Sequence, residues 1–63
     1  MGYSVYGNKG LGFEKVADTN QMEDGEKVLD NYKAGYVEFE GQAVAAKNLR
    51  PTDIEKDLRK RRS

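Results

Sequence analysis

The chain has 63 residues, enough for one small domain and too few for a large two-layer enzyme. It contains no cysteine and no histidine, which excludes disulfides, thiolate catalysis and zinc–thiolate sites and removes the commonest general base. Eleven basic and eleven acidic residues cancel to a net charge of zero. We therefore expect a non-catalytic protein with no cofactor and no metal.

The sequence also indicates the cellular compartment. No stretch approaches the length of a membrane-spanning helix, and the first ten residues lack the pattern of a signal peptide. We expect a cytoplasmic protein that does not bind membranes.

The charges are balanced in number but not in position. Residues 1–30 carry a net charge of −3, and residues 31–63 carry +3. Within the second half, residues 56–62 (KDLRKRR) hold five basic residues and one acidic residue. Such a cluster is typical either of a basic tail that contacts phosphate or an acidic partner, or of the solvated end of a helix, whose dipole favours cations there.

The first third of the chain has the pattern of a β-hairpin. Residues 3–6 (YSVY) are a short β-prone run, and residues 7–10 (GNKG) are typical of a turn. Residues 11–17 then alternate between apolar and polar positions, with Leu11 and Phe13 on one face. Residues 18–24 are polar and predict a loop.

The clearest strand signal lies at residues 35–40 (GYVEFE). Val37 and Phe39 alternate with two glutamates, so we expect an apolar face and a solvent-facing side that includes Tyr36. The two glutamates indicate a solvated strand face rather than an acid–base pair. A tight turn at residues 41–42 leads to a further short strand at residues 43–46.

The segment before this strand allows two interpretations. Residues 26–30 can pair with residues 35–40 as a hairpin whose loop contains Tyr32. The alternative is a helix over residues 21–33, capped by Asn20. Gly25 would lie inside that helix and costs about 1 kcal/mol relative to alanine, so we favour the hairpin.

The C-terminal segment predicts a short helix from Asp53. Thr52 and Glu55 have the spacing of a capping box, and Pro51 stops any helix from continuing in from upstream. Ile54 and Leu58 are four residues apart and can pack on the rest of the protein. We therefore divide the chain into a β-domain at residues 1–51 and a capped helix with a basic tail at residues 52–63.

Residues 26–51 resemble the central strands of small SH3-like barrels, notably Tudor, chromo-barrel and KOW-type modules, in which a V-x-F strand and a short turn precede a strand that ends in a 3₁₀ turn. Residues 47–49 match that turn. Residues 9–13 (KGLGF) are similar to an element of cold-shock domains, which are OB-fold proteins that bind single strands. Both resemblances imply a small β-barrel.

The predicted fold is therefore mostly β, a small SH3-like barrel with a short C-terminal helix; the alternative is an α+β fold with a helix at residues 21–33. The expected function is an accessory protein that binds nucleic acid or a nucleic-acid-processing complex. The alternatives are a protein-only adaptor, such as a phage-type regulator of a host enzyme, and a structural homodimer. The expected binding residues combine surface tyrosines with C-terminal cations: Tyr32, Tyr36, Lys47, Arg50, Arg59, Lys60, Arg61 and Arg62.

Overall fold

The computed structural model describes residues 2–10 and 12–62, apart from the side chain of Arg62. Its elements follow the chain in this order: β1 (Tyr3–Lys9), β2 (Gly12–Thr19), α1 (Met22–Leu29), β3 (Gly35–Phe39), β4 (Gln42–Lys47) and α2 (Pro51–Arg62). The four strands form one antiparallel sheet in the order β2-β1-β3-β4, which confirms a mostly β fold with a C-terminal helix. Leu11, which we expected in the second strand, lies outside the described residues.

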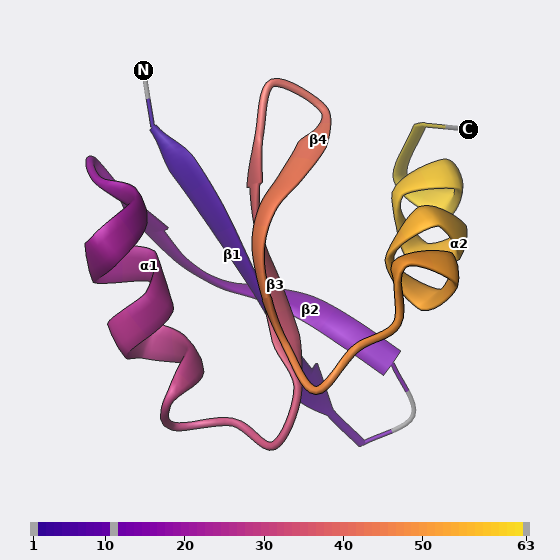
Figure 1. The fold of residues 1–63 in the computed structure, drawn as a ribbon, viewed down its shortest axis with the longest axis horizontal. Coiled ribbons are helices and arrows are strands. Elements are labelled where there is room, and N and C mark those ends of the chain that lie inside the picture. The colour runs from indigo at the N-terminus through magenta and orange to yellow at the C-terminus, as the bar shows by residue number, and fades with distance from the viewer. Residues whose placement is uncertain (1, 11, 63) are drawn as a thin grey trace.

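The sheet has helices on both sides, with α1 and α2 on opposite faces (Figure 1). Strands β2 and β4 are its two edges, so closure into an SH3-like barrel is not shown. The register of β1 and β3 explains how one sheet packs against a helix on each of its faces. The Val5–Val37 pair is followed by the Tyr6–Tyr36 pair, and successive residues of a strand point to opposite sides.

The strand predicted at residues 26–30 is wrong, and the helical alternative is correct over Met22–Leu29. Gly25 argued against this helix, and the structure shows why a glycine is there. A Cβ built on Gly25 would lie 3.0 Å from Val37 Cγ2 and 3.2 Å from Val5 Cγ2. The missing side chain therefore lets α1 lie directly on the sheet, and Leu29 completes the apolar cluster with the two valines.

The other face of the sheet is covered by larger side chains. Ile54 and Leu58 of α2 are buried against Tyr36, with Tyr6, Phe13 and Leu49 packed around them. The Tyr6 and Tyr36 rings stack with their centroids 5.1 Å apart. This second helix therefore rests on a layer of aromatic rings, whereas α1 contacts the sheet through aliphatic side chains and a glycine.

The turns on either side of β4 depend on left-handed backbone conformations. Glu40 and Gly41 have φ angles of 51° and 83°, as a two-residue hairpin with a type I′ turn requires. The Gly41 amide also donates a hydrogen bond of 2.6 Å to the Glu38 carboxylate. After β4, Asn48 has a φ of 53°, and its side-chain amide donates to the Lys33 carbonyl over 2.8 Å. A left-handed residue therefore stands where we predicted a 3₁₀ turn.

Helix α2 begins earlier than the predicted capping box, with Pro51 as its first residue. Proline suits this position because its φ is already helical and the first amide of a helix has no internal acceptor. The amides of Asp53 and Ile54 donate to the Arg50 carbonyl over 3.0 and 3.2 Å. The backbone at Arg50 thus starts the helix, ahead of Thr52. Neither helix in the described part of the chain has the length and apolarity needed to cross a bilayer.

Candidate partner-binding surface

The position of α2 is fixed by three side chains that we call the α2 anchor: Tyr36, Asp57 and Arg61. The Tyr36 hydroxyl donates a hydrogen bond to the Asp57 carboxylate, and Arg61 Nε donates to Asp57 Oδ2 over 2.9 Å. Arg61 also donates to the Phe13 carbonyl over 2.5 Å, and its guanidinium carbon lies 4.0 Å from the centre of the Tyr6 ring. The anchor therefore joins α2 to β1, β2 and β3.

Burial determines the protonation of the tyrosine in this anchor. The ring of Tyr36 is fully buried, and removal from water raises the pKa of its hydroxyl. The hydrogen bond to Asp57 raises this pKa further, because the protonated phenol is the donor. Tyr36 is therefore a neutral hydrogen-bond donor at physiological pH.

Three cations form what we call the outer face of α2: Lys56, Arg59 and Lys60. All three residues are exposed, and their spacing of three and four positions places them on one side of a helix. Ile54 and Leu58 occupy the opposite side, against the sheet. Arg50 is also exposed, just before the helix begins. The side chain of Arg62, one of the predicted binding residues, lies outside the described part of the chain.

The structure separates the remaining predicted binding residues from this surface. Tyr36 was expected on the solvent side of its strand, but it is fully buried because α2 covers that face of the sheet. Arg61 is held in the α2 anchor. Tyr32 is half-buried, with its ring 2.9 Å from where a Cβ of Gly7 would lie. Tyr36 and Arg61 therefore hold α2 on the sheet, and Tyr32 packs beside Gly7, so none of the three belongs to the outer face of α2.

Lys47 also has a structural role. Its ammonium group donates hydrogen bonds to the Leu29 carbonyl over 3.2 Å and to the Tyr32 carbonyl over 2.7 Å. Carbonyls at the C-terminal end of a helix have no partner within the helix, and a cation is favourable there. Lys47 therefore holds the end of α1 against β4, away from the outer face of α2.

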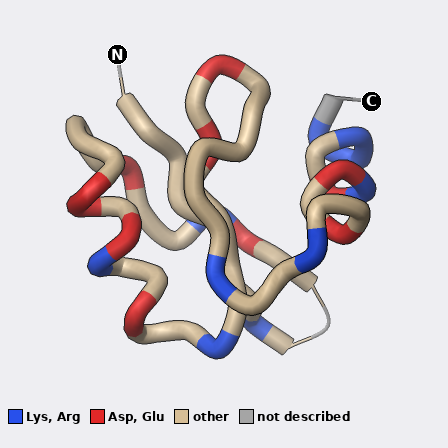
Figure 2. The backbone as a smooth tube through the Cα atoms, viewed as in Figure 1, with Lys and Arg blue, Asp and Glu red and all other residues tan. Residues whose placement is uncertain are grey.

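The two helices give the molecule an electrostatic direction (Figure 2). Helix α1 carries Glu23, Asp24 and Glu26 against one basic residue, Lys27. Helix α2 and the residue before it carry six of the eight basic residues in the second half of the chain, against three acidic residues, Asp53, Glu55 and Asp57. Since the sheet separates the helices, an anionic partner is attracted to the α2 side and repelled by the α1 side.

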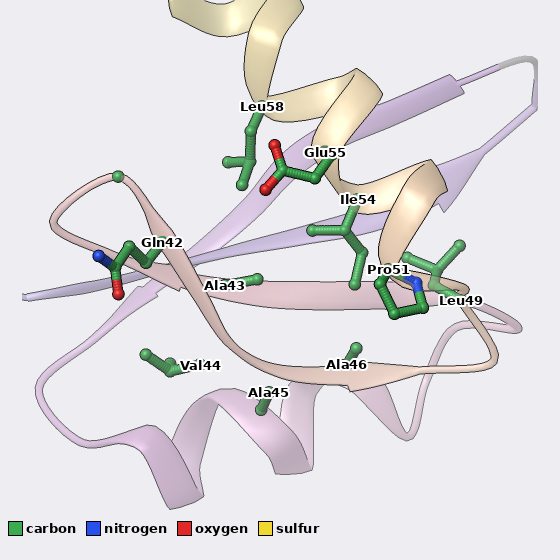
Figure 3. A pocket seen from close by; sticks show the side chains of 11 residues that line it. Gln42, Ala43, Val44, Ala45, Ala46, Leu49, Pro51, Ile54, Glu55 and Leu58 are labelled. Carbon is green, nitrogen blue, oxygen red and sulfur yellow. The ribbon is translucent and has the colours of Figure 1, made fainter.

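An open groove runs between β4 and α2, which we call the β4–α2 groove, and its volume is about 660 Å³. Its floor is made of small side chains, such as Ala43 and Ala46, and its wall includes Leu49, Ile54 and Leu58. Figure 3 shows Ala46 pointing toward Ile54, and the Glu55 carboxylate lying beside the aliphatic side chains of α2. Such a groove can take apolar side chains from outside the molecule.

No cluster of three or more acidic residues that would hold a metal ion occurs within residues 2–10 and 12–62. Comparisons with protein-family models, with curated proteins and with solved structures found no match. Inference about function therefore depends on the outer face of α2 and on the β4–α2 groove.

Sequence reasoning missed one basic residue and the whole groove. Lys56 had a usable signal, because it is three and four positions before Arg59 and Lys60. The groove had no such signal, since it forms only where α2 packs beside β4.

Proposed function

We propose that this chain is a non-catalytic, cytoplasmic accessory protein that contacts the phosphate backbone of nucleic acid through the outer face of α2. The observation that supports the proposal is the arrangement of Lys56, Arg59 and Lys60, which are exposed within two turns of a helix that is itself anchored to the sheet. Lysine and arginine on an exposed helix face attract the phosphates of nucleic acid, whatever the base sequence.

The anchor supports this proposal in a second way. Arg61 is held by Asp57 and Phe13, so the helix cannot turn its cations away from a bound strand without breaking those contacts. The acidic residues of α1 lie on the other side of the sheet (Figure 2). The net charge of zero is therefore compatible with binding on one side, although it weakens long-range attraction.

The test compares two triple variants with the same change in charge. One is Lys56→Gln, Arg59→Gln and Lys60→Gln on the outer face of α2. The control is Lys9→Gln, Lys27→Gln and Lys33→Gln, three exposed lysines elsewhere. Binding to a labelled single-stranded RNA and to a DNA duplex is measured by fluorescence anisotropy across a range of salt concentrations.

We expect the α2 triple variant to reduce the slope of log affinity against log salt by about two to three, while the control changes it by less than one. Equal loss in both variants would show that total charge, and not the outer face of α2, carries the binding. Absence of salt-dependent binding by the natural protein to either nucleic acid would contradict the proposal.

A protein-only adaptor is the second candidate, and the apolar β4–α2 groove favours it. Binding of a protein segment there would depend weakly on salt and would survive the α2 triple variant. The same pair of variants therefore separates the two functions.

A further inference from the structure

The two edges of the sheet differ in how they meet solvent. Edge strand β2 carries Glu14, Lys15 and Asp18, whose charges discourage pairing with another strand. Edge strand β4 has the sequence QAVAAK, so it carries no charge and no proline before Lys47. That lysine is itself bonded to carbonyls at the end of α1. The edge formed by β4 is therefore open to a further strand.

The β4 edge is short because of a bulge. The pairing with β3 shifts between Val37 and Glu38, which leaves Val44 as an extra residue on β4. Bulges twist a strand and limit regular pairing. An added strand would make only a few backbone hydrogen bonds, so side chains inserted into the β4–α2 groove must supply most of its contact.

The shape of the groove restricts what can fill it. Its floor beside α2 is made of alanines, and its volume of about 660 Å³ leaves room for several bulky side chains. Val44 is 40% exposed and is the largest apolar side chain that β4 leaves uncovered. A second copy that paired through its own β4 would bring from that strand only Ala43 and Ala46, which are too small to fill the groove. We therefore expect the occupant to be a different sequence with larger side chains.

The charges along the groove give it a direction. Glu40 is next to Gly41 at one end of the lining, and Glu55 stands in the wall with its carboxylate beside the groove (Figure 3). At the other end, exposed Arg50 lies between two lining residues, Leu49 and Pro51. A complementary segment carries an acidic residue toward Arg50 and a basic residue toward Glu40.

We propose that the β4–α2 groove and the outer edge of β4 bind an extended segment of a partner protein, with bulky aliphatic residues at alternate positions, an acidic residue at its N-terminal end and a basic residue at its C-terminal end. The direction follows from antiparallel pairing, which every strand pair of this sheet uses. Antiparallel addition places the N-terminus of the segment beside the C-terminal end of β4, near Arg50. This site does not depend on nucleic-acid binding by the outer face of α2.

The probe is an acetylated and amidated peptide of sequence Asp-Ser-Val-Thr-Leu-Ser-Val-Lys, titrated into isotope-labelled protein and followed by NMR. One control peptide exchanges the terminal Asp and Lys, and another replaces its three aliphatic residues with serine. We expect saturable shifts of the amides of residues 42–46, Ile54 and Leu58. Affinity should fall about 2- to 5-fold on exchange of the terminal charges, and binding should disappear with the serine peptide.

The matched protein variants are Ala46→Arg, which places a long side chain in the groove, and Thr52→Arg, which adds the same charge outside it. Both positions are exposed, so both variants should keep the native spectrum. Ala46→Arg should weaken peptide binding at least about tenfold, and Thr52→Arg should leave it nearly unchanged.

Three results would overturn the proposal: no saturable shift with the probe, equal shifts with the serine peptide, or a dimer through β4 that the probe does not displace. The α2 triple variant should still bind the probe. If the natural protein binds the probe but neither nucleic acid, the proposed function is contradicted and this site is left intact.

Discussion

The hydroxyl of Tyr36 donates a hydrogen bond to the carboxylate of Asp57, which is 21 residues later in the chain. Tyr36 lies on a central strand and is fully buried, while Asp57 lies on α2 and is 15% exposed. A buried hydroxyl without a partner would cost free energy, and this bond satisfies it. Apolar side chains hold α2 on the sheet, and this hydrogen bond specifies its position there.

Replacing Tyr36 with phenylalanine removes this bond and keeps the ring against Ile54 and Leu58. We expect Tyr36→Phe to lower the free energy of unfolding by about 1–2 kcal/mol, because Asp57 retains Arg61 as a donor. Urea unfolding followed by circular dichroism measures the change. Tyr32→Phe is the matched control and should alter stability by less than about 0.5 kcal/mol; an equal loss in the two variants would contradict the role of the bond.

The same hydroxyl predicts a loss of stability at alkaline pH. Burial, and then the hydrogen bond to Asp57, raise the pKa of Tyr36 in the folded protein, whereas an unfolded tyrosine ionises near pH 10. Below pH 10 both states keep the proton, so the contribution of Tyr36 is fully present. Above about pH 10 the unfolded state loses its proton first, and the free energy of unfolding falls by up to about 1.4 kcal/mol per pH unit.

Urea midpoints between pH 8 and pH 11 test this dependence on Tyr36. The stability difference between the natural protein and Tyr36→Phe should be constant up to about pH 10 and should shrink above it. A difference that stays constant through pH 11 would show that the hydroxyl ionises equally in the folded and unfolded states.

The strands and the C-terminal helix were predictable because their signals are local. The alternation around Val37 and Phe39 identified β3, and the spacing of Ile54 and Leu58 identified the buried side of α2. The alternation also placed Tyr36 on the opposite face from Val37, which is correct. It did not reveal that α2 would cover that second face, since nothing within the strand specifies a helix packed on it.

Helix α1 and the role of Lys47 also could not be predicted from local sequence signals. Propensity counts Gly25 against a helix, but close packing on Val37 needs a residue without a side chain. Lys47 resembles any surface lysine in sequence, yet its partner at Leu29 is 18 residues away. Contacts at that separation depend on the whole fold, so a single sequence could not assign these residues.

The close contact of α1 with the sheet predicts an unusual response to alanine. Gly25→Ala improves helix propensity by about 1 kcal/mol, but the added methyl group would lie 3.0 Å from Val37 Cγ2. Overpacking costs about 1–3 kcal/mol, so we expect a net loss of up to about 2 kcal/mol in urea unfolding. Gly12→Ala is the control, because a Cβ there meets nothing within 4 Å; greater stability of Gly25→Ala than of the natural protein would show that α1 can move away from the sheet.

Lys47 predicts a local effect at the end of α1. Lys47→Met keeps the aliphatic chain and removes both hydrogen bonds to the Leu29 and Tyr32 carbonyls. We expect a loss of about 1–2 kcal/mol and faster hydrogen exchange at the amides of residues 30–32. Lys9→Met, at an exposed position in β1, controls for the lost charge. Unchanged exchange at residues 30–32 in the Lys47 variant would contradict the capping role.

Substitutions of two neighbouring cations on α2, Lys60 and Arg61, should affect folding and binding differently. Arg61→Gln breaks the contacts with Asp57, Phe13 and Tyr6, so we expect it to lower the free energy of unfolding by about 1.5–3 kcal/mol. Lys60→Gln removes the same charge from the outer face of α2 and should change stability by less than about 0.5 kcal/mol. At low temperature both variants stay folded, and nucleic-acid binding can be compared directly. There Lys60→Gln should weaken binding more than Arg61→Gln, because Lys60 faces solvent while Arg61 is held by contacts within the protein. Weaker binding by the Arg61 variant than by the Lys60 variant would place the anchor within the binding surface.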